Sequence, residues 1–223
     1  LRVLRSTKLA ILMENKPSNF AIAVLSTRDE LYQGFKTLIH QTWAEDFRRN
    51  GVSVIFYEGD PSIDQLTFDE ETQTLSCPIK DGFDHTYGRS LMMFKWLFGR
   101  KDIDFVFRPN LSALIDAENF YGHLEQEGYG PQVFTGPPGQ VAHWYQILVH
   151  KGYKPIAKLI KNLGPKINFV SGAGFFLGRD VFEFVKDFRP EHPVGDDVGL
   201  GLGAKKFLTP FPRQLNFVRV MPS

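Results

Sequence analysis

Short apolar segments and longer amphipathic segments alternate along the first third of the chain. Apolar runs at Phe20–Ser26 and Val52–Tyr57 predict two buried strands. Between these runs, large apolar residues recur at helical spacing: Leu31, Phe35, Leu38, Ile39, Trp43 and Phe47. This spacing predicts one amphipathic helix over Arg28–Asn50, ended by Gly51. A strand, a helix and a strand in this order predict a βαβ unit with parallel strands.

The same pattern predicts further elements toward the C-terminal end. Strands are expected at Thr74–Ile79, Ile103–Phe107, Gln132–Thr135, Ile167–Val170, Phe175–Leu177 and Leu215–Val220. Helices are expected at His85–Gly99, Leu114–Gln126 and Val181–Phe188. The remaining segments predict a loop at Gly59–Gln73, a turn at Gly136–Gly139, and a strand or acceptor-side loop at His143–His150. Together these elements predict a single α/β domain over residues 1–223, with a mostly parallel central sheet flanked by helices.

Composition and charge narrow the classes of partner. Of the 223 residues, 43% are hydrophobic and 23% charged, which is ordinary for a globular domain. A net charge of +1 gives no electrostatic case for binding nucleic acid or an anionic membrane. Cys77 is the only cysteine, so no disulfide can form within the chain, and no apolar run is long enough to span a bilayer. We therefore expect a soluble protein, with the cytoplasm a compatible compartment, or one domain of a larger protein.

The segment from Asn168 to Gly199 carries the strongest chemical signal. A predicted strand runs into a turn of small residues, Ser171–Gly174, and about one helix later comes the carboxylate pair Asp196–Asp197 between glycines. Glycines let the backbone approach a ligand closely because no Cβ stands in the way. A carboxylate pair on a glycine-flanked loop can act as a general base or bind a cation. The structural alternatives are that the pair caps the following helix and that the glycines form only a tight turn.

The order of these motifs resembles the inverting glycosyltransferases of the Fringe and β-1,3-galactosyltransferase kind. The matching residues are Ser171-Gly172-Ala173-Gly174-Phe175, Gly178-Arg179-Asp180 and Asp196-Asp197-Val198, with Gly199 or Gly201 at the family's following glycine. Three earlier segments fit in the same order: Ile39–Trp43, in which His40 replaces the family's arginine, the predicted helix around Asp84, and Phe105–Ser112. The resemblance therefore spans roughly Phe20 to Gly203, most of the chain.

The resemblance implies a GT-A-like fold, with a nucleotide-sugar half over about 20–112 and an acceptor and catalytic half over about 113–215. It implies that Asp197, the second acidic residue of the pair, is the catalytic base. The expected donor-binding residues are Ser26, Thr27, Arg28, Asp60, Arg108, Asn110 and Ser112. The expected acceptor-binding residues are Trp144, Gly172, Ala173, Gly174 and Asp196. Each group also has a structural reading, as helix caps, solvated loop residues, a tight turn or core aromatics.

The chain departs from the family where a D-x-D motif would hold Mn²⁺ or Mg²⁺. Asn110 and Ser112 stand in place of the carboxylates, and neutral oxygens are poor substitutes for the ligands that hard divalent cations favour. The sequence thus puts a divalent metal cofactor in doubt and suggests Arg108 as an alternative positive charge for the donor diphosphate. A literal D-x-D, Asp102-Ile103-Asp104, begins a predicted strand and so is expected at the wrong edge of the sheet for a ligand.

Taken together, the residues and the resemblance they carry imply an inverting glycosyltransferase. It would move a sugar from a nucleotide-diphosphate sugar, with UDP as the family's usual nucleotide, to a hydroxyl of an acceptor glycan or glycoprotein. Three alternatives stay open: a retaining GT-A enzyme, a nucleotide- or glycan-binding module without catalysis, and a Rossmann-like methyltransferase using the glycine turn. The last is disfavoured because the turn does not follow the first strand.

Overall fold

The computed structural model describes residues 19–142, 145, 148, 152–160 and 166–208. Its centre is a seven-stranded sheet in the order β3-β4-β2-β1-β5-β9-β6. The strands in chain order are β1 Phe20–Leu25, β2 Ser53–Gly59, β3 Thr67–Asp69, β4 Thr74–Cys77, β5 Phe105–Pro109, β6 Phe134–Thr135 and β9 Gly174–Gly178. Strands β4, β2, β1 and β5 run parallel, whereas β3 and β9 pair antiparallel with their neighbours.

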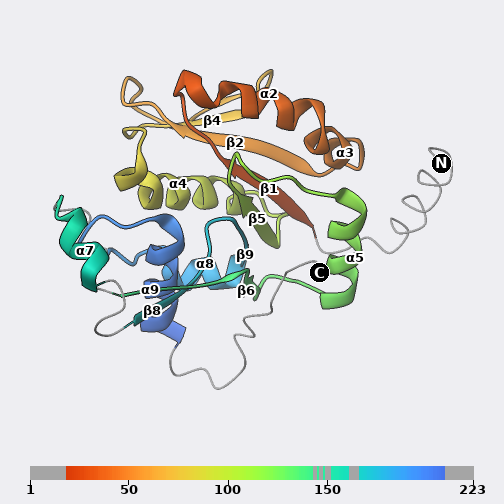
Figure 1. Cartoon of the computed structure of the whole chain (residues 1–223). Helices are drawn as coiled ribbons and strands as arrows, with labels where there is room; N and C mark the ends of the chain where they lie inside the picture. Colours follow the sequence, from red (N-terminus) through yellow and green to blue (C-terminus); the bar gives the residue numbers. More distant parts are fainter. Residues whose placement is uncertain (1–18, 143–144, 146–147, 149–151, 161–165, 209–223) are drawn as a thin grey trace.

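Helices cover both faces of this sheet (Figure 1). The 3-10 helix η1 Glu30–Tyr32 leads into α2 Gln33–Gln41 and α3 Trp43–Arg49, which lie on one face with α5 Ala117–Glu127. The 3-10 helix η2 Phe83–His85 leads into α4 Thr86–Phe98, which lies on the other face with α8 Arg179–Val185 and α9 Asp196–Leu208. The protein is therefore an α/β domain with a mixed, mostly parallel sheet between two helical layers, as the sequence predicted.

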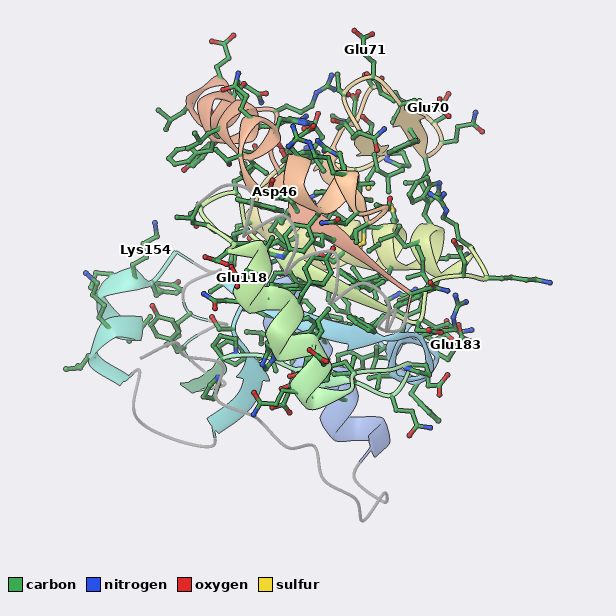
Figure 2. All side chains as sticks on the ribbon, turned by 90° about the vertical axis from the view of Figure 1, so that its right-hand side faces the viewer. Asp46, Glu70, Glu71, Glu118, Lys154 and Glu183 are labelled. Atoms are coloured by element: carbon green, nitrogen blue, oxygen red, sulfur yellow. The ribbon has the colours of Figure 1, made fainter. Side chains whose placement is uncertain are left out.

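Alternation along the strands explains why two cores form. In β1, Ala21 and Ala23 belong to the core under α4, whereas Ile22 and Val24 belong to the core under α3. Successive side chains of a strand point to opposite faces, so a run that is apolar at every position is buried on both. Charged side chains such as Glu70, Glu71 and Glu183 point outward instead (Figure 2).

A second, two-stranded sheet pairs β7 Pro138–Ala142 with β8 Lys166–Val170, antiparallel. Pro138 and Gly139 are therefore strand residues, and the predicted turn at Gly136–Gly139 is wrong over its second half. The short helix α7 Lys154–Ile160 precedes β8. Among the described residues, no helix is both long and apolar enough to cross a membrane.

The predicted helix over Arg28–Asn50 is wrong as a single element. Thr42 leaves the helical conformation, with φ −119° and ψ −114°, and separates α2 from α3. Downstream of the break, Trp43 and Phe47 are buried, but Leu31 and Leu38 are 75% and 54% exposed. The apolar spacing thus runs over η1, α2 and α3, and only some of its residues reach the core.

Other differences from the predicted elements are smaller. Strand β3 lies within the predicted loop Gly59–Gln73, and it forms because it pairs along β4 at the sheet edge. The predicted strand at Leu215–Val220 lies outside the described residues. Of His143–His150, the structure describes only Tyr145 and Leu148, and both have helical backbone.

Candidate active site

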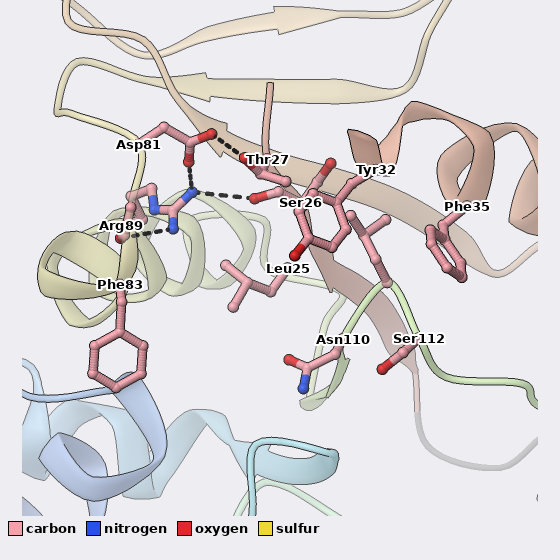
Figure 3. Close-up of a pocket in the computed structure, with 12 residues that line it drawn as sticks. Leu25, Ser26, Thr27, Tyr32, Phe35, Asp81, Phe83, Arg89, Asn110 and Ser112 are labelled. Atoms are coloured by element: carbon pink, nitrogen blue, oxygen red, sulfur yellow. Dashed lines mark hydrogen bonds and ion pairs between the residues drawn. The ribbon is translucent and has the colours of Figure 1, made fainter. Parts of the chain in front are cut away.

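The carboxyl ends of the parallel strands meet at one edge of the sheet, where a pocket opens. The chain leaves β1 at Leu25 and β5 at Pro109, and a bridge between Leu25 and Asn110 holds the two exits together. The pocket has a volume of about 450 Å³ (Figure 3). Its walls are formed by Leu25, Ser26, Thr27, Tyr32, Phe35, Asp81, Gly82, Phe83, Arg89, Asn110, Leu111 and Ser112. This is the edge at which open α/β sheets bind ligands, and the volume suits a small organic molecule.

Asp81 and Arg89 tie the loops of this pocket together. Asp81 Oδ2 accepts hydrogen bonds from Thr27 Oγ1 at 2.5 Å and from the Arg28 N–H at 2.7 Å, while Oδ1 pairs with Arg89 Nη1. Arg89 is 3% exposed and also donates to the carbonyl oxygens of Ser26 and Gly82, at 3.1 and 3.2 Å. The loops after β1 and β4 are thereby fixed against α4, and the two charges neutralise each other.

Sequence reasoning did not select Asp81 or Arg89. The available signal was the place of Asp81 just beyond the predicted strand Thr74–Ile79, because ligands bind outside the carboxyl ends of such strands. Arg89 lies inside the predicted helix His85–Gly99, where a charged residue gives no sign that its side chain turns inward.

Six of the seven expected donor-binding residues divide into two groups. Ser26, Thr27, Asn110 and Ser112 line the pocket, so the structure brings them together. Arg28 and Asp60 form an ion pair beside the end of β2, and Asp60 Oδ1 also accepts hydrogen bonds from Ser62. These two residues lie at the same edge of the sheet but do not line the pocket.

Arg108, the remaining expected donor contact, is buried under the site. Its side chain is 1% exposed, and its guanidinium donates to Tyr57 Oη at 3.1 Å, to Asn110 Oδ1 at 2.7 Å and to the Gly172 carbonyl at 2.6 Å. Nη2 forms an ion pair with Asp196, 2.7 Å from Oδ2. Burial opposes the charge, but Asp196 and Tyr57 outweigh it and raise the pKa of Arg108. The guanidinium nitrogens of Arg108 all bond to protein groups, so this geometry does not support direct contact between Arg108 and a diphosphate.

Asp196 shares this buried network. It is 3% exposed, and its Oδ2 also accepts a hydrogen bond from Ser90 Oγ at 2.8 Å. Tyr57 Oη lies 2.8 Å from the same Ser90 oxygen, and burial raises the pKa of Tyr57 to about 12, so the phenol stays neutral. The network joins β2, α4, β5 and α9 beneath the pocket edge. It leaves Asp196 without the exposure that an acceptor contact needs.

Asp197 is the member of the pair that stays partly exposed. Both aspartates are the first residues of α9, so the pair lies in the first turn of a helix and the predicted glycine-flanked loop is wrong. Asp197 Oδ2 accepts a hydrogen bond from the Gly172 N–H at 2.9 Å, and Oδ1 accepts one from the Val198 N–H at 2.8 Å. Burial, followed by the nearby charge of Asp196, raises the pKa of Asp197 despite these bonds. The outcome is a fixed, partly accessible carboxylate with raised proton affinity.

The glycine turn supports this carboxylate from behind. Gly172 donates its N–H to Asp197 and gives its carbonyl to Arg108. A Cβ on Gly172 would stand 3.1 Å from Asp197 Oδ2 and 3.3 Å from Arg108 Nη1. Ala173 is exposed, and Gly174 begins β9 against the ring of Phe107. Protein groups therefore pack against Gly172 and Gly174, and Ala173 is the exposed residue of the turn.

The groups around Asn110 do not fit a divalent cation. Asn110 Oδ1 already accepts from Arg108 Nη1 at 2.7 Å, so a cation there would face the guanidinium charge. Asp196 is neutralised by the same arginine. In the described part of the chain, no group of three or more His, Cys, Asp or Glu side chains is arranged to hold a metal. Asp102 and Asp104 precede β5 and so lie at the opposite edge of the sheet, as predicted.

Trp144, an expected acceptor contact, lies outside the described residues.

In comparisons with known proteins, no protein-family model matches the chain and no curated protein is significantly similar to it.

Proposed function

We propose that this protein is an inverting glycosyltransferase with Asp197 as its general base. The nucleotide of a nucleotide-diphosphate sugar, with UDP the first candidate, would occupy the pocket between Ser26, Thr27 and Asn110. The acceptor would be a glycan hydroxyl that approaches Asp197. The family resemblance and the carboxylate beside a pocket at the carboxyl edge of the sheet both support this reading.

The observation that carries the proposal is the state of Asp197. Its carboxylate is held by two backbone N–H groups, partly exposed, and has a raised pKa. A general base works best when its pKa lies near the working pH, and perturbed carboxyl groups beside a pocket are candidates for this role. The adjacent Asp196 is locked into an ion pair, so the two carboxyl groups have different environments and only one is available to a substrate.

The reaction follows from this assignment. Asp197 takes the proton of the acceptor hydroxyl as its oxygen attacks the anomeric carbon of the donor. The new carbon–oxygen bond forms on the face opposite the diphosphate. The bond between the anomeric carbon and the diphosphate oxygen breaks, and the diphosphate leaves with the electron pair. One displacement inverts the anomeric configuration. Arg108 acts from beneath, since it holds Gly172 and Asn110 rather than the leaving group.

A binding module without catalysis is the second candidate, and two observations favour it. Asn110 and Ser112 replace the carboxylates expected at the end of β5, and the charges of Arg89 and Arg108 are each neutralised by an aspartate. The pocket walls thus offer little net positive charge to a departing diphosphate.

Turnover separates the two candidates. The test is hydrolysis and transfer from a panel of UDP-, GDP- and dTDP-sugars, each with Mn²⁺ and with EDTA, for wild type, Asp197→Asn and the control Asp64→Asn. Asp64 is an exposed loop residue, so its variant tests the loss of a carboxylate elsewhere. Turnover of one donor that falls in Asp197→Asn alone supports the proposal. Nucleotide binding without turnover of any donor would favour the binding module, and binding of S-adenosylmethionine instead of nucleotide would contradict both.

A further inference from the structure

Phe83 is a large apolar side chain that remains exposed at the pocket. Its side chain is 59% exposed, and it belongs to the pocket wall. Most apolar side chains of this size lie in the two cores of the protein. Covering an exposed aromatic group with a ligand lowers the free energy of the complex, because apolar surface is removed from water. Such groups commonly line ligand sites.

The ring of Phe83 lies between the pocket and Asp197. The position that a Cβ on Gly195 would occupy is 3.4 Å from Phe83 Cζ and 2.8 Å from Asp197 Oδ1. The tip of the ring and the carboxylate therefore both lie against Gly195, the residue before α9. Figure 3 shows the ring extending from η2 toward the elements below the pocket, on the side away from Phe35. A ligand group that extends from the pocket along Gly195 toward Asp197 would meet this ring.

The turn that presents Phe83 is firmly held. Gly82 has φ +130°, a conformation that side-chain-bearing residues rarely adopt, and its carbonyl accepts a hydrogen bond from Arg89 Nη2 at 3.2 Å. The Phe83 carbonyl accepts from Thr86 Oγ1 at 2.8 Å. Because Arg89 is itself fixed by Asp81, the backbone under the ring is set by the same pair that shapes the pocket. The backbone that carries the ring is thus pre-positioned, which lowers the cost of ordering this turn on binding.

We propose that Phe83 is the stacking platform for a pyranose ring at the reacting centre. The inference rests on the proposed function and adds to it a named sugar contact. The apolar C–H face of a hexopyranose can lie on the flat aromatic face, while its hydroxyl groups stay directed toward water and Asp197. The pyranose ring that stacks on Phe83 belongs either to the donor sugar or to the acceptor. In both cases a sugar lies between the pocket and Asp197.

The test compares the affinities of UDP and of UDP-hexoses by titration calorimetry for four proteins. These are wild type, Phe83→Leu, Phe83→Tyr and the control Phe184→Leu, in which an exposed phenylalanine of α8 is changed. If the donor sugar stacks on Phe83, Phe83→Leu weakens UDP-galactose, UDP-glucose or UDP-N-acetylglucosamine binding by about five- to tenfold and leaves UDP unchanged. Phe83→Tyr keeps the ring and restores the affinity. Phe184→Leu changes neither.

A second arm covers the acceptor. Saturation-transfer NMR with methyl galactoside and methyl N-acetylglucosaminide, in the presence of UDP, reports acceptor-side stacking when Phe83→Leu abolishes the signal and Phe83→Tyr retains it. Equal loss of UDP affinity in Phe83→Leu would make Phe83 a wall of the nucleotide pocket and overturn the stacking proposal while the proposed function stands. No effect in either arm would also overturn it. Failure of wild type to bind any nucleotide or nucleotide sugar would overturn the proposed function as well.

Discussion

At the scale of single residues, two adjacent aspartates have different environments. Asp196 is enclosed with Arg108, Ser90 and Tyr57, so its charge is compensated. Asp197 receives two backbone hydrogen bonds but lacks a direct cationic partner among the contacts that the structure describes. Arg108 lowers the pKa of Asp197 less than burial and Asp196 raise it. The helix terminus of α9 thus separates a structural carboxylate from a chemically available one.

The raised pKa of Asp197 gives a prediction for the pH dependence of turnover. A base must be ionised to accept a proton, and a carboxyl with raised pKa stays protonated to higher pH. We therefore expect kcat to rise with pH, with an apparent pKa above the ordinary aspartate range. We expect Asp197→Asn to lower kcat by about 10²- to 10⁴-fold. The measurement is kcat from pH 4 to 8 for the donor that turns over. An acid limb at the pH of an ordinary aspartate would contradict the assignment.

The Arg108–Asp196 pair gives a second prediction, on stability. Removing one partner leaves a buried charge uncompensated, so Asp196→Asn is expected to lower the free energy of unfolding by about 3–5 kcal/mol. Replacing both, as Arg108→Met with Asp196→Asn, should cost less than the sum of the single changes, because neither charge is then left alone. Urea denaturation of wild type, Asp196→Asn, Arg108→Met and the double variant measures the coupling. Strictly additive effects would show that the pair is not an interacting unit.

At the scale of elements, the helices α2 and α3 are joined through His40. Its Nδ1 lies 3.0 Å from Arg48 Nη1, and because arginine can only donate, Nδ1 is the acceptor and carries no proton. The ring also packs on Phe56 of β2, with centroids 4.6 Å apart. Burial, then the charges of Arg48 and Lys36, lower the pKa of His40. Neutral imidazole therefore holds the helix pair to the sheet.

This contact predicts a loss of stability on acidification. A histidine with lowered pKa binds fewer protons in the folded protein than in the unfolded chain near pH 6, so its contribution is lost as the pH falls below the unfolded value of about 6.5. We expect the free energy of unfolding to fall between pH 7.5 and 5.0 and to fall less in His40→Gln. His192→Gln, in the loop before α9, is the matched control. An equal pH dependence in wild type and His40→Gln would contradict the prediction.

At the scale of the whole molecule, the sequence was sufficient for the inner strands of the sheet but not for its edge or for the site. The run Phe20–Leu25 is apolar at every position, as expected of a strand buried on both faces, and shorter apolar runs mark β2 and β5. The break at Thr42 could not, since nothing in its local sequence marks a helix end. The same holds for the short edge strand β3, which depends on pairing with β4.

The candidate site was predictable in its place and less so in its contacts. Ser26, Thr27, Asn110 and Ser112 were expected from the family resemblance, and because they follow strands that run parallel they meet in one pocket. Whether a charged residue faces a ligand or a buried partner depends on distant segments, and Arg108 meets Asp196 across 88 positions of sequence. Sequence spacing carries no information on such pairs. For the same reason Asp81, Arg89 and Phe83 were recognised only in three dimensions.

The most direct test of the account is the anomeric configuration of the first product. The donor that turns over is incubated with wild type or Asp197→Asn and an acceptor glycan, and proton NMR follows the anomeric signals of donor and product. We expect wild type to convert an α-linked donor sugar into a β-linked product, and Asp197→Asn to leave the donor unchanged. A product that retains the α configuration, or equal conversion by both proteins, would contradict the assignment of Asp197 as the general base.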